Sequence, residues 1–266
     1  MDEPIQPDLL RERLAHSRFS SHIHYETSLD STNALARTLA GHGAPEGTIV
    51  ITEEQTAGRG RRGRSWVSPA GSNLLFSLLL RPPMEGDRVF VLTMALALAG
   101  VKAVKRVAGV KAMIKWPNDL YVGTKKLAGV LTEFSVTGRH VDWAVLGMGT
   151  NVGWHPEVPE EGGAPATSLL EEIGQRVSRN ELIIEILTEF ESLYKEVVAG
   201  NMKAAYEEWN QNCLVLGKTV VIESERERIE GKALCIDDLG ALIIEDAEGN
   251  QRRILTGDVS LRFASS

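Results

Sequence analysis

Cysteine is scarce in this sequence, which has only Cys213 and Cys235 among its 266 residues. Their spacing matches neither a zinc-binding module nor a disulfide framework. We therefore expect both thiols to be inert and partly buried. The sequence also lacks the G-x-S-x-G nucleophile elbow of serine hydrolases. Covalent catalysis by cysteine or serine thus has no support.

Long hydrophobic runs are absent as well. The longest apolar stretch, residues 89–101, is interrupted by Thr93 and Gly100 and is soon followed by Lys102, so it predicts a buried helix rather than a membrane span. The first residues, MDEPIQPDLLRERL, lack the basic start, apolar stretch and cleavage site of a secretory signal. We expect a cytoplasmic protein without a membrane partner.

Positive charge is in deficit, with 29 lysines and arginines against 36 aspartates and glutamates. The net charge of -7 disfavours attraction of nucleic acid over the whole chain. Residues 58–66, GRGRRGRSW, are a local exception that we call the arginine-glycine loop. Its arginines repel one another and its glycines leave the backbone free, so we expect a loop that stays disordered until an anionic ligand binds.

Three other interpretations of the arginine-glycine loop compete with anion binding. A basic loop can be a solvated surface, but here glycines alternate with arginines and end at Trp66, so backbone amides and guanidinium groups could surround an anion together. Gly58, Gly60 and Gly63 match the dinucleotide fingerprint, yet Pro69 follows where that motif must open a helix. Nucleic-acid binding stays a minor alternative, because no interleaved aromatic residues support it.

Three further motifs stand at the ends of predicted strands. Residues 115–119, KWPND, place a lysine, a fixed turn and two side-chain oxygens together. An Asx turn would explain Asn118 and Asp119, and the same oxygens could hold a hard cation such as Mg2+. Glycines in 126–129, KLAG, and in 147–151, GMGTN, would admit a ligand close to the backbone, although a β-bulge is the simpler explanation for the first.

Hydrophobic periodicity predicts an α+β fold, with a mixed β-sheet flanked by helices and a small C-terminal β-barrel. The predicted helices cover residues 7–16, 30–40, 87–107, 181–198 and 204–209. The predicted strands cover residues 22–25, 48–52, 73–80, 112–116, 119–122, 127–136 and 141–152 in the sheet, and 219–223, 229–236, 241–246 and 252–255 in the barrel. Residues 30–33, DSTN, supply N-cap chemistry for the second helix.

Five segments together resemble the biotin-protein ligase family, with the order and spacing maintained over residues 30–263. They are DSTN at 30–33, GRGRRGRSW at 58–66, KWPND at 115–119, KLAG at 126–129 and GMGTN at 147–151. The resemblance implies an N-terminal lead-in at residues 1–29 and a catalytic domain at 30–213, with the fold shared with lipoate ligases. An SH3-like β-barrel would then occupy residues 214–266.

The resemblance also implies a reaction and its binding residues. Biotin would be activated with ATP and Mg2+ to biotinyl-5'-AMP and pyrophosphate, and then transferred to a lysine of a biotin carboxyl carrier protein. The residues implied for biotin are Ser31, Thr32, Asn33, Gln55, Gly58, Arg59, Arg61, Lys126, Gly129, Leu131 and Gly147. Those implied for ATP and the adenylate are Arg61, Arg64, Trp66, Lys115, Asn118, Lys126 and Asn151.

Charge suggests which of these residues are catalytic. The biotin carboxylate must approach a phosphate, so cations have to neutralise two anions that meet. Lys126 is the first candidate because it would reach both groups, and Arg61 is the second. Asp119 is the candidate for orienting or deprotonating the acceptor lysine. We expect Trp66 and Trp116 to cover the anhydride and exclude water.

Several alternatives stay open. A lipoate or octanoyl ligase shares the fold and attaches a different acid, and a ligand-sensing regulator would bind without catalysis. Repressor members of the family carry an N-terminal winged helix-turn-helix, for which residues 1–29 leave no room, so we expect no operator DNA binding by this chain. The resemblance allows either a monomer or a homodimer that pairs through sheet edges.

Overall fold

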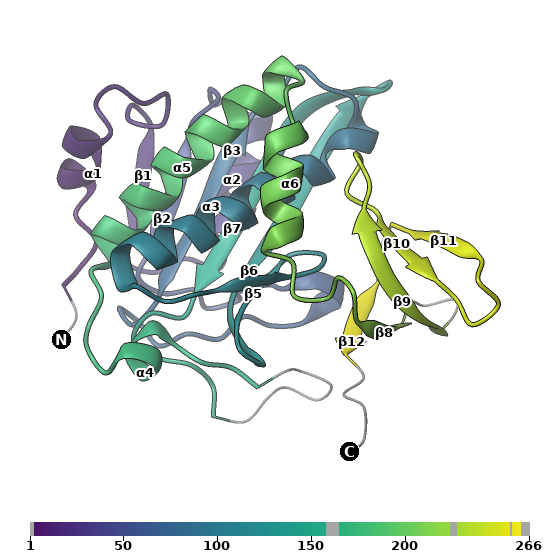
Figure 1. Ribbon diagram of the computed structural model, residues 1–266. Coiled ribbons are helices and arrows are strands. Elements are labelled where there is room, and N and C mark those ends of the chain that lie inside the picture. Colours follow the sequence, from purple (N-terminus) through teal and green to yellow (C-terminus); the bar gives the residue numbers. More distant parts are fainter. Residues whose placement is uncertain (1–2, 158–164, 224–227, 256, 262–266) are drawn as a thin grey trace.

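A seven-stranded mixed sheet dominates the computed structural model, which describes residues 3–157, 165–223, 228–255 and 257–261 (Figure 1). Its strand order is β1-β2-β3-β7-β6-β5-β4. β1 and β2 are parallel, whereas the other neighbouring strands are antiparallel. The strands are β1 (Ile23–Glu26), β2 (Ile49–Thr52), β3 (Leu74–Leu80), β4 (Met113–Lys115), β5 (Asp119–Val122), β6 (Lys125–Thr137) and β7 (His140–Thr150). The predicted mixed sheet is confirmed.

Helices cover both faces of this sheet (Figure 1). α3 (Phe90–Ala108) and α5 (Arg179–Ala199) pack on one face beside α6 (Lys203–Gln211), and α2 (Thr32–Gly41) packs on the other. α3 is apolar almost all round because it packs against both the sheet and α5. The shorter helices are α1 (Pro7–Arg13), η1 (Arg61–Gly63), η2 (Gly86–Arg88) and α4 (Leu169–Ile173). α4 was not predicted, since its single turn is too short to show a period.

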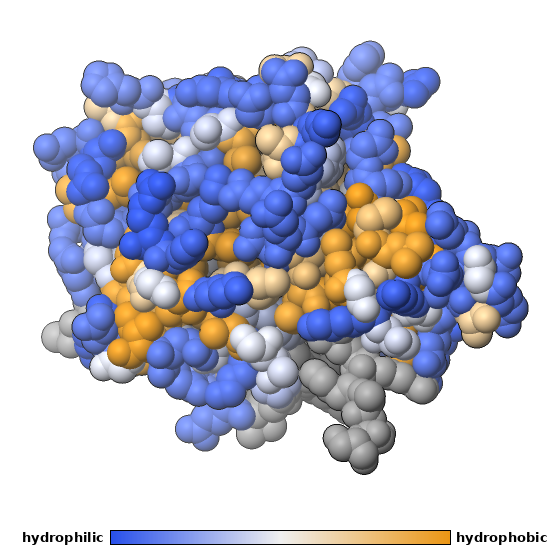
Figure 2. Space-filling view, in the orientation of Figure 1, coloured by the Kyte–Doolittle hydropathy of each residue, from blue (hydrophilic) through white to orange (hydrophobic). Residues whose placement is uncertain are grey.

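Ion pairs join the outer sides of α3, α5 and α6. Lys102 Nζ lies 3.3 Å from a Glu189 oxygen and 3.1 Å from a Glu208 oxygen. Arg106 lies 2.6 Å from Glu185 and 3.1 Å from Glu189. Figure 2 shows mostly hydrophilic residues over this side of the molecule. Within the described ranges, every helix is too short or too polar to cross a membrane.

The N-terminal lead-in is an integral part of the large domain. Leu10, Leu14 and Phe19 are buried in the same core as the sheet and α5. The guanidinium of Arg179, only 2% exposed, lies 2.5 Å from Glu53 Oε2 and donates to the carbonyl of Glu3 at 2.8 Å. Because a buried charge needs such a partner, this ion pair holds the lead-in against the sheet.

The small C-terminal sheet has five antiparallel strands in the order β11-β10-β9-β8-β12. They are β8 (Thr219–Glu223), β9 (Arg228–Ile236), β10 (Leu242–Glu245), β11 (Gln251–Ile254) and β12 (Asp258–Leu261). The predicted small β domain is confirmed, and β12 is a strand that was not predicted. Residues 262–266 of the predicted barrel lie outside the described residues, and its proposed boundary at 213–214 stays a prediction.

The two cysteines differ in exposure. Cys213 is buried beside β4, and burial raises the pKa of its thiol to about 11. Cys235 is exposed, so the prediction of two partly buried thiols is wrong for this residue. The register between β9 and β10 shifts so that Ala233 and Cys235 face consecutive residues of β10. This bulge resets the alternation of β9 and turns Cys235 outward.

Candidate active site

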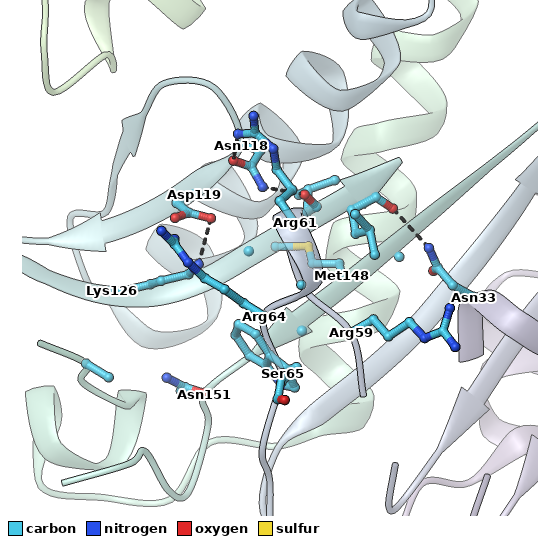
Figure 3. A pocket seen from close by; sticks show the side chains of 18 of the residues that line it. Asn33, Arg59, Arg61, Arg64, Ser65, Asn118, Asp119, Lys126, Met148 and Asn151 are labelled. Atoms are coloured by element: carbon cyan, nitrogen blue, oxygen red, sulfur yellow. Dashed lines mark hydrogen bonds and ion pairs between the residues drawn. The ribbon is translucent and has the colours of Figure 1, made fainter. Parts of the chain in front are cut away.

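A cavity of about 250 Å³ lies beside the sheet, between the start of α2, the arginine-glycine loop and strands β5, β6 and β7 (Figure 3). The predicted site residues that line it are Ser31, Thr32, Asn33, Gln55, Arg59, Arg61, Arg64, Trp66, Lys115, Asn118, Asp119, Lys126, Gly129, Leu131, Gly147 and Asn151. Residues separated by more than a hundred positions therefore meet in one place. Gly58 is the predicted site residue that is not part of this lining.

Gly58 closes the base of the arginine-glycine loop instead. Its carbonyl accepts a hydrogen bond from the Trp66 N–H at 3.0 Å, and a Cβ at this position would lie 2.4 Å from the Trp66 carbonyl oxygen. Only glycine allows the two arms of the loop to approach so closely. The structure thus gives Gly58 a role in loop closure, and its predicted biotin contact has no support from the cavity lining.

The arginine-glycine loop is a closed turn in the structure, where the sequence predicts disorder without a ligand. Arg59 pairs with Ser65 as an isolated bridge, and Gly60 N–H donates to the Arg64 carbonyl at 2.7 Å. At the tip, Arg62 has a φ of 55° and Gly63 a φ of 73°, which reverses the chain. These backbone bonds offset the repulsion between the arginines. A change of loop mobility on ligand binding stays a prediction.

One end of the cavity is built from uncharged polar groups. Ser31 is the N-cap residue of α2, but its side chain makes no capping hydrogen bond, contrary to the predicted N-cap chemistry. Thr32 N–H donates to Gln55 Oε1 at 2.8 Å. Asn33 is close to Gly147, where a Cβ would come 2.0 Å from Asn33 Oδ1. This end therefore offers hydroxyl and amide groups, and its walls require glycine at position 147.

The other end of the cavity is built from charged groups. Lys126 Nζ lies 2.8 Å from Asp119 Oδ1 and 5.7 Å from the centre of the Trp66 ring. The Trp66 ring lies against Gly149, where a Cβ would come 2.5 Å from Cε2 of the ring. The indole N–H of Trp66 is buried and has no hydrogen-bond partner among the described residues. Trp66 thus lies over Lys126 and offers a free donor, and its predicted role as a cover for the anhydride stays a prediction.

A β-bulge brings Lys126 to this end. Asp119 pairs with Gly129, whereas Tyr121 pairs with Lys126, so β6 has one extra residue, Leu127, within this stretch. Alternate residues of a strand share a face, so Asp119 and Tyr121 point the same way. Without the bulge Lys126 would point to the opposite face. The KLAG motif therefore contains the backbone irregularity that places its own lysine.

Lys115 and Asn151 stand at the edges of the cavity. Lys115 Nζ lies 5.0 Å from the centre of the Tyr121 ring and 3.4 Å from its hydroxyl. Asn151 is 3% exposed, and its Nδ2 donates to the Thr167 carbonyl at 3.0 Å. Asn151 thus fixes the chain that follows β7, and its predicted contact with the adenylate stays a prediction.

Asn118 and Asp119 already face cations. Asn118 Oδ1 accepts a hydrogen bond from Arg61 at 2.8 Å, and Asn118 Nδ2 donates to the Val130 carbonyl at 2.6 Å. No group of three or more His, Cys, Asp or Glu side chains suited to a metal occurs in the described part of the chain. Mg2+ needs few protein ligands when it arrives on phosphates. The pair fits an ion carried by ATP, provided that Arg61 and Lys126 turn toward the phosphates.

Trp116 lines the cavity but is buried, and its expected role as a cover for the anhydride stays a prediction. It is 1% exposed, and its indole N–H donates to the carbonyl of Gly240 in the small sheet at 3.0 Å. Gly240 has a φ of +84°, and a Cβ there would lie 2.1 Å from Cδ1 of Phe90. Trp116 therefore joins the KWPND segment to the small sheet. No sequence signal links residues so far apart.

Sequence reasoning missed several lining residues. Tyr121 could have been found, because it lies two positions after Asp119 on the same face of a strand. Val259 of the small sheet had no such signal. The other missed lining residues are Gly60, Ser65, Val67, Phe76, Pro117, Val130, Met148, Gly149, Pro156 and Ala166.

Fold and site together define a member of the biotin and lipoate ligase class. A family model described as "Biotin/lipoate A/B protein ligase family" matches residues 25–151, and one described as "Biotin protein ligase C terminal domain" matches residues 215–262. The chain is 36% identical over 241 residues to the bifunctional ligase/repressor BirA of Bacillus subtilis, covering 90% of this chain and 74% of the relative.

Two further relatives narrow this class. The biotin--[acetyl-CoA-carboxylase] ligase of Paracoccus denitrificans is 34% identical, with 84% of this chain and 93% of the relative covered. A solved structure of the biotin protein ligase from Aquifex aeolicus in complex with biotin and ATP is 31% identical, with a TM-score of 0.77, 91% of this chain and 99% of that chain covered. The chain belongs to the biotin protein ligase family and is a ligase.

Proposed function

We propose that the chain activates biotin with ATP to biotinyl-5'-AMP and transfers the biotinyl group to a lysine of a biotin carboxyl carrier protein. The arrangement of the cavity carries this proposal. Figure 3 shows Asn33 and Arg59 on one side, Asp119, Lys126 and Arg64 on the other, and Arg61 between them. Such a cavity fits a ligand with an uncharged polar head and an anionic tail.

Activation requires two anions to meet. The biotin carboxylate oxygen forms a bond to the α-phosphorus of ATP, and the bond to the β-phosphate oxygen breaks as pyrophosphate leaves. Arg61, Arg64 and Lys126 line the cavity and supply positive charge for this encounter. When bound with ATP beside Asn118 and Asp119, Mg2+ would neutralise further phosphate charge. We assign Lys126 as the main catalytic residue because its Nζ lies at the charged end of the cavity, close to Asp119 and the Trp66 ring.

The arginine-glycine loop protects the product. A mixed anhydride hydrolyses readily, so its survival depends on the exclusion of water. Trp66 lies over Lys126, and its unpartnered indole N–H would donate to an oxygen of the adenylate. The backbone hydrogen bonds within the loop hold it closed, which supports this protective role. Trp116 is not needed as a second cover, because its indole N–H is engaged with Gly240.

Transfer requires a neutral lysine amine from the acceptor. The amine nitrogen forms an amide bond with the biotinyl carbonyl carbon, the bond to the phosphate oxygen breaks, and AMP leaves. Asp119 would orient this amine and accept its proton. Its Oδ1 faces Lys126 in the structure, so the carboxylate becomes available once Lys126 turns to the phosphate.

The setting of this reaction is also proposed. ATP is consumed and the acceptor is a carboxylase component, so we place the reaction in the cytoplasm. The described residues before β1 form α1 and pack into the core. The proposal includes either a monomer or a homodimer that pairs through sheet edges.

A lipoate ligase is the closest alternative, and the polar end of the cavity disfavours it. Hydroxyl and amide groups would be left unpaired by an apolar ring, which a site built for hydrogen bonding rejects strongly. The test supplies biotin or lipoate with ATP, Mg2+ and a carrier domain, and measures pyrophosphate release and the mass of the carrier. We expect pyrophosphate and a biotinylated lysine only with biotin. Lipoylation, or no pyrophosphate from biotin, would overturn the proposal.

A further inference from the structure

The polar end of the cavity rests on a buried serine that is absent from the cavity lining. Ser77 lies in β3 and is 0% exposed. Its Oγ lies 2.8 Å from Thr32 Oγ1 and 2.6 Å from Asn33 Oδ1. Thr32 Oγ1 in turn lies 3.0 Å from Gln55 Oε1. Four oxygens thus form a row from Gln55 to Asn33, which we call the oxygen row. Gln55, Thr32 and Asn33 line the cavity, whereas Ser77 lies behind them and is buried.

At the Gln55 end of the oxygen row, the side-chain oxygen is fixed as an acceptor. Gln55 Oε1 accepts the backbone N–H of Thr32 at 2.8 Å, so the amide of Gln55 must direct its oxygen, not its nitrogen, toward Thr32. An amide oxygen carries no proton to donate.

At the Asn33 end of the oxygen row, the side-chain oxygen is fixed as an acceptor too (Figure 3). Asn33 Nδ2 donates to the Leu131 carbonyl at 3.2 Å and to Glu133 Oε2 at 2.9 Å. Both partners only accept, so Asn33 Oδ1 has to face Ser77. Arg37, 3.1 Å from Glu133 Oε1, holds the Glu133 carboxylate. The orientation of Asn33 is therefore set by groups outside the oxygen row.

The oxygen row is one proton short. It has three close oxygen contacts but only two hydroxyl protons, those of Thr32 and Ser77. The shortest contact, 2.6 Å to Asn33 Oδ1, requires the proton of Ser77, because an amide oxygen has none to give. Ser77 Oγ can then accept the proton of Thr32. The contact without a proton is thereby moved to Thr32 and Gln55, where a ligand can reach it.

We propose that Ser77 is a positioning residue that draws the hydroxyl proton of Thr32 away from the cavity. Thr32 Oγ1 and Gln55 Oε1 then present only lone pairs, which makes this end of the cavity selective for an N–H group. The inference rests on the proposed function, because the ureido ring of biotin has such N–H groups and a lipoyl ring has none. Ser77 acts through Thr32 and does not touch the ligand.

The test compares the wild type with Ser77→Ala in calorimetric binding of biotin and of two cyclic carbamate analogues, each with one ureido N–H replaced by a ring oxygen. We expect the wild type to prefer biotin over one carbamate by at least about tenfold. In Ser77→Ala the Thr32 proton can turn toward the cavity and donate to the ring oxygen, so this preference shrinks by at least about threefold. A preference ratio equal in both proteins would overturn the proposal, even if all ligands bind more weakly.

Thr93→Val is the matched control. Thr93 is a buried residue whose hydroxyl lies 2.7 Å from that of Thr132, and neither residue lines the cavity. We expect lower stability and an unchanged preference ratio. A ratio that shifts as much as in Ser77→Ala would show that any lost core hydroxyl has this effect, and would contradict a specific role for Ser77.

A neutron structure of the unliganded wild type tests the oxygen row even if Ser77→Ala does not fold. We expect the Thr32 deuterium on the line to Ser77 Oγ. A deuterium directed at Gln55 Oε1 would overturn the proposal. Failure of the wild type to bind biotin would instead count against the proposed function, and the neutron result on the proton direction would stand independently of it.

Discussion

Lys126 Nζ lies 2.8 Å from Asp119 Oδ1, and the two residues share a face of the sheet only because of the bulge at Leu127. The pair joins the KWPND and KLAG motifs into one unit. In the proposed reaction its members act in turn, since Lys126 neutralises the phosphate during activation and Asp119 is released to receive the acceptor amine. Their replacement should therefore affect different steps.

Lys126→Ala is expected to reduce the rate of biotinyl-5'-AMP formation by about 10²–10³, because a preorganised charge at the reacting phosphate is lost. Single-turnover release of pyrophosphate measures this rate. Lys125→Ala is the matched control, since Lys125 Nζ pairs with Glu171 at 2.6 Å and lies outside the cavity lining. Near-normal adenylate formation by Lys126→Ala would refute its catalytic role.

Asp119→Ala is expected to slow transfer from preformed biotinyl-5'-AMP by about 10²–10⁴, while biotin binding changes less. The reason is that Asp119 faces the charged end of the cavity, away from the polar groups at Thr32 and Gln55. Transfer is measured as carrier mass after addition of the adenylate, and binding by calorimetry. Unchanged transfer would show that the acceptor amine loses its proton elsewhere.

Trp116→Phe is expected to lower the free energy of unfolding by about 1–3 kcal/mol beyond the cost of the smaller ring, since the Gly240 carbonyl loses a buried donor. Trp209→Phe is the control for ring size, because the buried Trp209 indole N–H has no hydrogen-bond partner among the described residues. Denaturant unfolding compares the two. Equal losses of unfolding free energy in both variants would mean that the Trp116 hydrogen bond contributes little to stability.

Acid should weaken the small sheet through Asp237. Burial alone would raise the pKa of Asp237, but hydrogen bonds from Arg253 and from the N–H groups of Ala241 and Leu239 outweigh it and lower this pKa. A carboxyl with a lowered folded-state pKa stabilises the fold above its ordinary pKa, and this contribution is lost as pH falls through the folded-state value.

Asp237→Asn should therefore cost stability at neutral pH and progressively less below about pH 4. Arg253→Gln should reduce the same pH dependence, because it removes one cause of the lowered pKa. The measurement is the difference in unfolding free energy between each variant and the wild type across pH. A difference that does not change with pH would disprove the linkage.

Much of the fold could be predicted because local patterns determine it. α3 and α5 follow from apolar residues at helical spacing, and each strand of the large sheet follows from its own run of apolar residues. The charged and polar motifs were also predicted to form one site, and their residues line one cavity. The predictions of helices and strands succeeded because each depends on residues close together in the chain, whereas the role of each lining residue stays a prediction.

The remaining features depend on contacts between distant residues. Trp116 finds its partner at Gly240, and Ser77 joins Thr32 to Asn33 only after β3 packs against α2. A β-bulge was the simpler explanation for the glycine of KLAG, and β6 has one at Leu127, but the sequence does not show that this bulge turns Lys126 toward Asp119. Sequence periodicity therefore places the elements, whereas tertiary packing decides where Trp116 points and how Lys126 reaches Asp119.

A crystal structure of the protein with biotinyl-5'-AMP tests the central claim most directly. We expect the ureido ring to lie beside Thr32 and Gln55, and the phosphate to lie within hydrogen-bond distance of Lys126 and an arginine of the arginine-glycine loop. An adenylate bound elsewhere, or one in this cavity with its phosphate away from Lys126, would contradict it.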